Sequence, residues 1–207
     1  FYHFEQSKRV CEKLEKNGEG LNLTAEVLDG IERHTTGEWA KTLEGRIVRW
    51  ADRIAYINHD IDDAIRAHII SERDLPSVYT DVLGHSPKER LNTLIHSMIQ
   101  ESMNQPDICM ASSVEEAMLG IRSYMFETVY TNPVAKAQEK KAQSLLEALY
   151  HHFMKEFNEL PRDYIALVEE RGEKKESVVC DYIAGMTDQY AIQVYEDLHI
   201  PFVWKVV

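Results

Sequence analysis

The chain has 207 residues and a mass of 24.0 kDa, which is enough to bury a sizeable core in one large domain or two small ones. Hydrophobic residues make up 44% and charged residues 28%, as is usual in globular proteins. The formal net charge of −12 argues against a broad nucleic-acid-binding surface, because such surfaces are basic. Three widely spaced cysteines without a CxxC pair favour reduced thiols and a cytoplasmic location. No apolar run reaches the length of about 18 residues that would predict a membrane span.

Helical patterns follow one another along the chain, with Gly, Pro, Asn and Ser between them. The predicted helices cover about 4–14, 25–31, 43–70, 77–83, 87–103, 113–130 and 134–157, a short stretch after Pro161, and 177–198. Thr24 is expected to cap the second of these, and Ser86 with Pro87 to begin the fifth. Almost no window alternates with a period of two residues, so the predicted fold class is all-α. No repeat or long linker interrupts 1–207, which favours a single helical unit.

The longest predicted helix has two different faces. Its apolar face gathers Trp50, Ile54, Ile57, Ile61, Ala64 and Ile65. Its polar face gathers Asp52, Tyr56, His59, Asp60 and Asp63. Carboxylates in one stripe repel one another unless a cation, a polar ligand or water compensates. The pattern therefore leaves both a binding site and a solvated surface open.

A second polar track has the same spacing. Arg122, Phe126 and Tyr130 follow one another at intervals of four residues on one helical face. Such a face can bind a phosphate through the arginine and pack a base or sugar against the rings. An arginine lying beside ordinary core aromatics is the alternative.

Two histidines are candidates for chemistry. His3 lies on the first predicted helix and is either a general acid or an ordinary surface residue. The adjacent pair His59-Asp60 has the form of the metal-binding signature of HD phosphohydrolases. A metal site needs further ligands from other helices, because two adjacent side chains cannot complete a coordination sphere. The pair alone is therefore weak evidence for a metal site.

Four stretches resemble the dGTPase-like branch of the HD superfamily, the deoxynucleoside triphosphate triphosphohydrolases. Residues 1–10 contain the pattern H-x-x-Q-S-x-R, and 20–24 read GLNLT. Residues 44–64 are similar to the family's E…ADxIAYxxHDxxDA helix, and 181–191 to its closing DYIAGMTDxYA block. The resemblance runs in order along nearly the whole chain. It implies a helical HD architecture in which 1–130 complete the HD core and 131–207 form a C-terminal extension.

The resemblance also implies a set of site residues. In the family a divalent metal is held by a His, an adjacent His-Asp pair and a distant Asp. The distant Asp matches Asp52 rather than Asp60, and the other three ligands would precede Phe1. We therefore expect a fragment that is inactive by itself. Matching positions assign a catalytic role to His3, a triphosphate contact to Arg122, and sugar contacts to Tyr56, Asp60 and Tyr130.

Two of these assignments carry further detail. Asp60 is expected to accept a hydrogen bond from the 3′-hydroxyl, and Tyr130 to lie where a 2′-hydroxyl would clash. Phe126 stands where some family members have a histidine, so no contact is assigned to it.

The activity implied by the resemblance is metal-dependent hydrolysis of a deoxynucleoside triphosphate to deoxynucleoside and triphosphate. Mg²⁺ or Mn²⁺, a dNTP substrate, a nucleotide effector and a homo-oligomer are the implied cofactor and partners. Two alternatives remain open. One is another HD-type nucleotide phosphodiesterase that uses His59-Asp60, and the other is a non-catalytic helical module for nucleotide binding or assembly.

Overall fold

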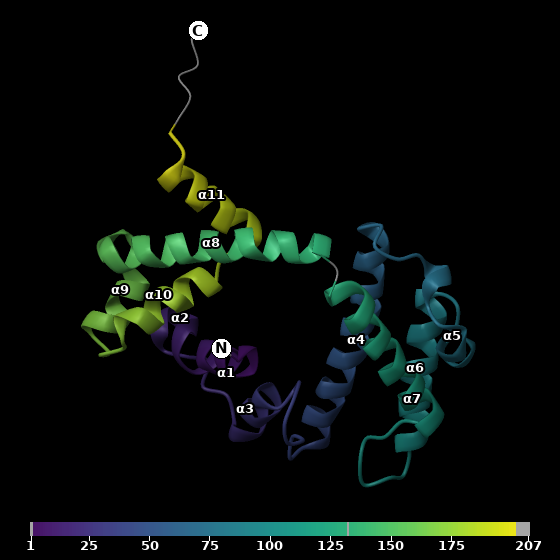
Figure 1. Ribbon diagram of the computed structural model, residues 1–207. Helices are drawn as coiled ribbons and strands as arrows, with labels where there is room; N and C mark the ends of the chain where they lie inside the picture. The colour runs from purple at the N-terminus through teal and green to yellow at the C-terminus, as the bar shows by residue number, and fades with distance from the viewer. Residues whose placement is uncertain (1, 132, 202–207) are drawn as a thin grey trace. The chain divides into compact units, whose positions relative to one another are not determined.

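The computed structural model describes residues 2–131 and 133–201, without the side chains of 133–137. Every element assigned within these ranges is helical, which confirms the all-α prediction. The chain divides into two compact units (Figure 1). Unit 1 comprises Phe1–Glu15 and Glu19–Asn132, and unit 2 comprises Lys16–Gly18 and Pro133–Val207. Among the helices of the described part, none combines the length and apolarity needed to cross a membrane.

Unit 1 contains most of the predicted helices. They are α1 (His3–Arg9), η1 (Val10–Leu14), α3 (Ala25–Glu32), α4 (Leu43–Arg66), η2 (Glu72–Asp74), α5 (Ser77–Leu83), α6 (Pro87–Ser102), α7 (Ser112–Met125) and η3 (Phe126–Tyr130). Between η1 and α3, α2 (Glu15–Gly18) is a turn in which Lys16 and Asn17 have positive φ. The two predicted caps are confirmed. The Thr24 hydroxyl accepts from the amide of Val27 at 3.5 Å, and the Ser86 hydroxyl accepts from that of Glu89 at 3.3 Å.

The long helix α4 buries the predicted apolar face. Trp50, Ile54, Ile57, Ile61 and Ala64 are all at most 3% exposed, and Ile65 packs at the edge of the same core. The helix ends at Arg66, earlier than predicted, because His68 adopts a positive φ of 56° that an α-helix cannot contain. Its N-terminus is capped by Thr42, whose hydroxyl accepts from the Gly45 amide at 3.2 Å.

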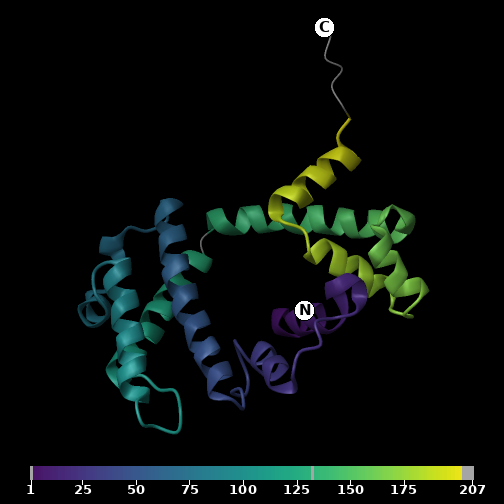
Figure 2. The same cartoon turned by 180° about the vertical axis from the view of Figure 1, so that it is seen from behind.

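The core of unit 1 is formed where α4 packs with α6 and α7, and α5 packs on α6 and α7 (Figure 2). From α7 it receives Val114, Ala117, Met118, Ile121 and Met125. Leu83 of α5 and Leu94 of α6 are buried with them, each 1% exposed. Burying a side chain of this size stabilises the fold by roughly 1.5–3 kcal/mol. The relative positions of α4 and α7 are therefore determined by apolar packing.

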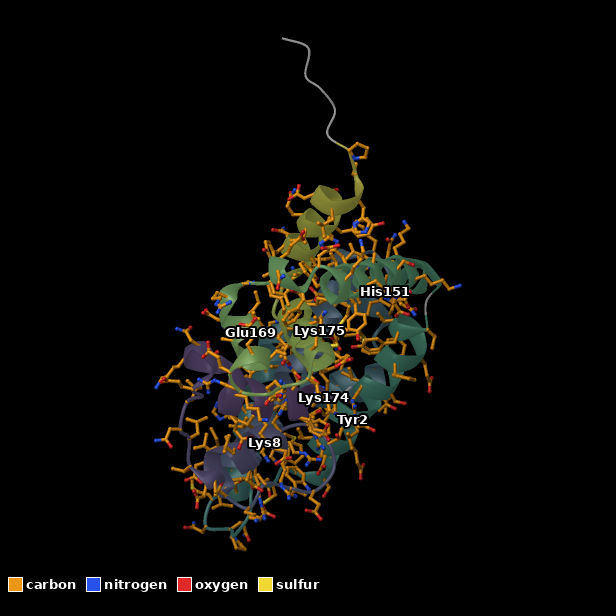
Figure 3. The ribbon with its side chains drawn as sticks, turned by 90° about the vertical axis from the view of Figure 1, so that its left-hand side faces the viewer. Tyr2, Lys8, His151, Glu169, Lys174 and Lys175 are labelled. Carbon is orange, nitrogen blue, oxygen red and sulfur yellow. The ribbon has the colours of Figure 1, made fainter. Side chains whose placement is uncertain are left out.

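Unit 2 has a separate core. It contains α8 (Pro133–Lys155), η4 (Phe157–Glu159), α9 (Arg162–Glu169), α10 (Lys175–Ala184) and α11 (Asp188–His199). Its buried residues are Leu149, Phe153, Leu160, Ile165, Val179 and Ala191. The ammonium of Lys175, labelled in Figure 3, lies 4.9 Å from the centre of the Phe157 ring and so joins the start of α10 to η4.

The prediction of one continuous helix over 177–198 is wrong. The chain leaves helical geometry after Ala184, and α11 begins again at Asp188. The physical reason is a new N-cap, because the Thr187 hydroxyl accepts from the amide of Tyr190 at 3.2 Å. Gly185 precedes this cap and has the low helix propensity that favours a break.

Gly120 allows α5 and α7 to approach each other closely. A Cβ atom at this position would lie 2.3 Å from two ring carbons of Tyr79. We expect Gly120→Ala to lower the free energy of unfolding by about 1–3 kcal/mol, because the ring must move within packed surroundings. Denaturant unfolding of the single variant and of Gly120→Ala in a Tyr79→Leu background would test this. With the ring removed, the substitution should become neutral or stabilising, since alanine is the better helix former. An equal loss in both backgrounds would contradict the explanation.

Candidate functional site

The polar face of α4 carries the predicted track of Asp52, Tyr56 and Asp60. Burial of the apolar face directs these side chains away from the core. Asp52 and Tyr56 are exposed and Asp60 is half-buried. Two cavities, both within unit 1, lie along this track, and they share Tyr56, Ile57 and Arg122.

The larger cavity has a volume of about 460 Å³. Its lining combines one face of α4 with residues of α7 and η3: Tyr56, Ile57, Asp60, Leu119, Arg122, Ser123, Met125, Phe126 and Tyr130. The second predicted track therefore lies opposite the first. Phe126 and Tyr130 are 64% and 37% exposed, so their rings are available to a ligand and are not core aromatics.

Two hydroxyl groups and one carboxyl group meet in this cavity. The Tyr130 hydroxyl donates a hydrogen bond to Oδ2 of Asp60 and lies 2.9 Å from the Tyr56 hydroxyl. Burial raises the pKa of Asp60, while the hydrogen bond from Tyr130 works in the opposite direction. The pKa of Tyr130 is also raised, first by burial and then by its hydrogen bond to Asp60, so its hydroxyl stays protonated and able to donate.

The smaller cavity has a volume of about 230 Å³ and a different chemical character. It is lined by His3, Thr35, Asp52, Arg53, Tyr56, Ile57 and Arg122. The fold thus brings His3 of α1 and Asp52 of α4 into one cavity with Arg122 of α7. The His3 ring makes an edge contact with His34, with 5.3 Å between the ring centres. All six predicted site residues line one or both cavities.

Arg53 is a cavity residue that the sequence prediction missed. Burial lowers the pKa of its guanidinium, and the positive charge of Arg122 lowers it further. Two guanidinium groups that line one small cavity form a site suited to a polyanion. On the helical wheel Arg53 lies between the two faces of α4, so periodicity did not select it. Its position beside Asp52, three residues before Tyr56, is the signal that could have found it.

The described residues do not fit a complete metal site. Among the residues the structure describes, no three His, Cys, Asp or Glu side chains lie together so that they could hold one ion. In the cavity of Asp52 the other charged side chains are Arg53 and Arg122, which repel a cation. His59 is exposed and lines neither cavity, so the rival pair His59-Asp60 is not directed at a common site with His3 and Asp52.

Comparisons with known proteins relate the chain to phosphohydrolases. Residues 108–197 match the family described as a phosphohydrolase-associated domain. A deoxyguanosinetriphosphate triphosphohydrolase-like protein of Caldanaerobacter subterraneus subsp. tengcongensis is 44% identical over 99% of this chain and 60% of its own length. A protein of the same description from Clostridium perfringens is 40% identical over 97% of this chain and 61% of its own. The chain thus spans about 60% of the length of these relatives, and over nearly all of its own length it is similar to deoxyguanosinetriphosphate triphosphohydrolase-like proteins.

Proposed function

We propose that the full-length protein hydrolyses a deoxynucleoside triphosphate to a deoxynucleoside and inorganic triphosphate. The observation that carries the proposal is the pair of adjoining cavities along α4. The larger offers hydroxyl, carboxyl and aromatic groups and shares the Arg122 guanidinium with the smaller one. The smaller cavity adds a second guanidinium, from Arg53, and the imidazole of His3 beside Asp52. A nucleotide has the same division into a neutral polar end and a polyanionic end.

The larger cavity receives the nucleoside. Asp60 accepts a hydrogen bond from Tyr130 through Oδ2, which leaves Oδ1 as an acceptor for the 3′-hydroxyl of the sugar. Tyr56 and Tyr130 enclose the sugar, and the Tyr130 ring lies where a 2′-hydroxyl would have to fit. The exposed ring of Phe126 offers an apolar surface to the base or sugar.

The smaller cavity receives the phosphates. Arg53 and Arg122 offset the negative charge that builds on the phosphate oxygens during attack. Water adds to the α-phosphorus, and the bond from this phosphorus to the 5′-oxygen breaks. His3 gives a proton to the departing 5′-oxygen and recovers one from the attacking water. The products are a deoxynucleoside and triphosphate.

A divalent metal is part of the proposal for the full-length protein, with Asp52 as one ligand. One carboxylate does not hold a catalytic ion tightly, and the described residues contain no group of three His, Cys, Asp or Glu side chains that could hold an ion. A homo-oligomer and a nucleotide effector, both implied by the family resemblance, stay predictions.

Substitutions on α4 distinguish the proposal from the rival HD site. In the full-length protein, we expect Asp52→Ala to lose bound metal and triphosphate release together, by at least about 100-fold in kcat, because a metal ligand is removed. His59→Ala, seven residues further along the same helix and outside both cavities, should retain both. Metal content and triphosphate release from each dNTP with added Mn²⁺ are the measurements.

Other results would select an alternative. Metal loss on His59→Ala, with hydrolysis of nucleotide phosphodiesters, would support the rival HD enzyme. Tight dNTP binding by the wild-type protein without turnover would support a non-catalytic binding module. Either result would overturn the proposed reaction.

Asp60→Asn should stabilise the fold at neutral pH while weakening the binding of a deoxynucleoside. Because burial raises the pKa of Asp60 in the folded state, its ionised form costs stability at neutral pH. This cost disappears as the pH falls through the folded-state pKa and is absent below the ordinary aspartate value of about 3.9. We therefore expect Asp60→Asn to raise Tm at pH 7 and to lose this advantage near pH 3–4. Thermal unfolding of both proteins across this range is the measurement.

The same variant should weaken the binding of a deoxynucleoside. Losing a hydrogen bond to a charged acceptor costs about 1.5–3 kcal/mol, which corresponds to a Kd roughly 10- to 100-fold higher. Asp81→Asn is the matched control, because Asp81 is an exposed carboxylate of α5 outside both cavities. If Asp60→Asn bound deoxynucleosides as tightly as this control, the sugar-binding role would be wrong.

A further inference from the structure

One guanidinium of the phosphate cavity lies against two indole rings. The guanidinium carbon of Arg53 is 5.3 Å from the centre of the Trp39 ring and 5.4 Å from that of Trp50. The two indoles are tilted by 38° with their centres 5.6 Å apart. Trp50 is buried in the core at 3% exposure, whereas Trp39 is 39% exposed and lies on the loop before α4.

A second arginine holds this loop against the helix. Arg49 is only 4% exposed, and its Nη1 donates to the backbone carbonyls of Gly37 at 3.2 Å and Glu38 at 2.8 Å. Its guanidinium carbon is 4.3 Å from the centre of the Trp39 ring. Trp39 is therefore fixed both through the backbone of its loop and through its ring.

The Trp39 ring offsets repulsion between two neighbouring arginines. Arg49 and Arg53 are one helical turn apart, and like charges at this spacing repel each other. Burial lowers the pKa of Arg49, and the positive charge of Arg53 lowers it further. Burial also lowers the pKa of Arg53, followed by the positive charge of Arg122. The electron-rich face of an indole attracts a guanidinium and is the best aromatic partner for it. A long arginine side chain also loses rotamer freedom when it is stacked in this way.

We propose that Trp39 is a positioning residue for triphosphate binding. Its indole holds Arg53 in the rotamer that faces the cavity shared with Arg122 and His3, so the cation is in place before the ligand arrives. The inference rests on the proposed function, since it takes the small cavity as the phosphate end of a nucleotide site. Trp39 itself does not line either cavity and touches the ligand only through Arg53.

The test measures the two halves of the ligand separately. In the full-length protein, Trp39→Leu removes the aromatic face, and Trp39→Phe keeps a weaker one. We expect the Kd of inorganic triphosphate to rise about five- to tenfold in Trp39→Leu and by less in Trp39→Phe, as the order of cation–π strength requires. The Kd of the deoxynucleoside should not change in either variant, because its cavity lies at the other end of the track.

A double-mutant cycle separates positioning from general loss of structure. In an Arg53→Met background, Trp39→Leu should no longer weaken triphosphate binding, because the side chain that it positions is gone. Arg73→Met, which removes an exposed arginine outside both cavities, is the matched background in which the full effect should persist. Equal effects in both backgrounds, or a parallel loss of deoxynucleoside binding, would overturn the inference.

Measurements on the wild-type protein distinguish failure of the proposed function from failure of the role of Trp39. If it binds neither triphosphate nor deoxynucleoside and releases no triphosphate from dNTPs, the proposed function fails. If it binds triphosphate and both Trp39 variants bind it equally well, the function stands and the role of Trp39 is wrong. Should Trp39→Leu fail to fold, the graded comparison of Trp39→Phe with wild type in the two arginine backgrounds gives the same decision.

Discussion

Burial of the isoleucine stripe on α4 is the constraint on which the candidate site depends. Ile54, Ile57 and Ile61 are at most 3% exposed, and each stabilises the fold by roughly 1.5–3 kcal/mol. A hydrogen bond of the polar face contributes about 0.5–1.5 kcal/mol. The apolar side therefore decides how α4 is rotated about its axis. Ile57 also lines both cavities, so the floor of the site is part of the core.

The polar face that this rotation exposes is not optimised for stability. Asp60 is half-buried with a raised pKa, although its carboxylate would be better solvated at the surface. Its hydrogen bond from Tyr130 offsets only part of the desolvation, because burial remains the larger effect on its pKa. Arg53 carries a similar cost beside Arg122. Costs of this kind are expected where side chains are held ready for a ligand.

Periodicity predicted the helices and the side chains that a single helix presents together. It found the buried face of α4, and the tracks of Asp52–Asp60 and Arg122–Tyr130 that line the cavities. It could not predict the contact between Arg53 and Trp39. That contact joins a loop to a helix, so no periodic spacing in the sequence marks it. The break between α10 and α11 was missed because Thr187 acts through a local cap, while the apolar pattern continues across it. The family resemblance supplied roles for matched residues but gave no geometry.

The polar tracks on α4 and on α7 with η3 lie side by side, so that each end of one faces an end of the other. Asp52 and Arg122 line the smaller cavity, while Asp60 and Tyr130 meet in the larger one. Each pair of ends is eight residues apart along its helix, a rise of about 12 Å on α4. Because α4 and α7 pack in one core, the distance between the two ends of these tracks is set by helix geometry and not by a loop. A ligand with a hydroxyl group at one end and phosphates at the other can then contact both ends at once. A ligand lacking either end loses the contacts of that end, so under the proposed function this spacing would favour a whole nucleotide over its separate parts.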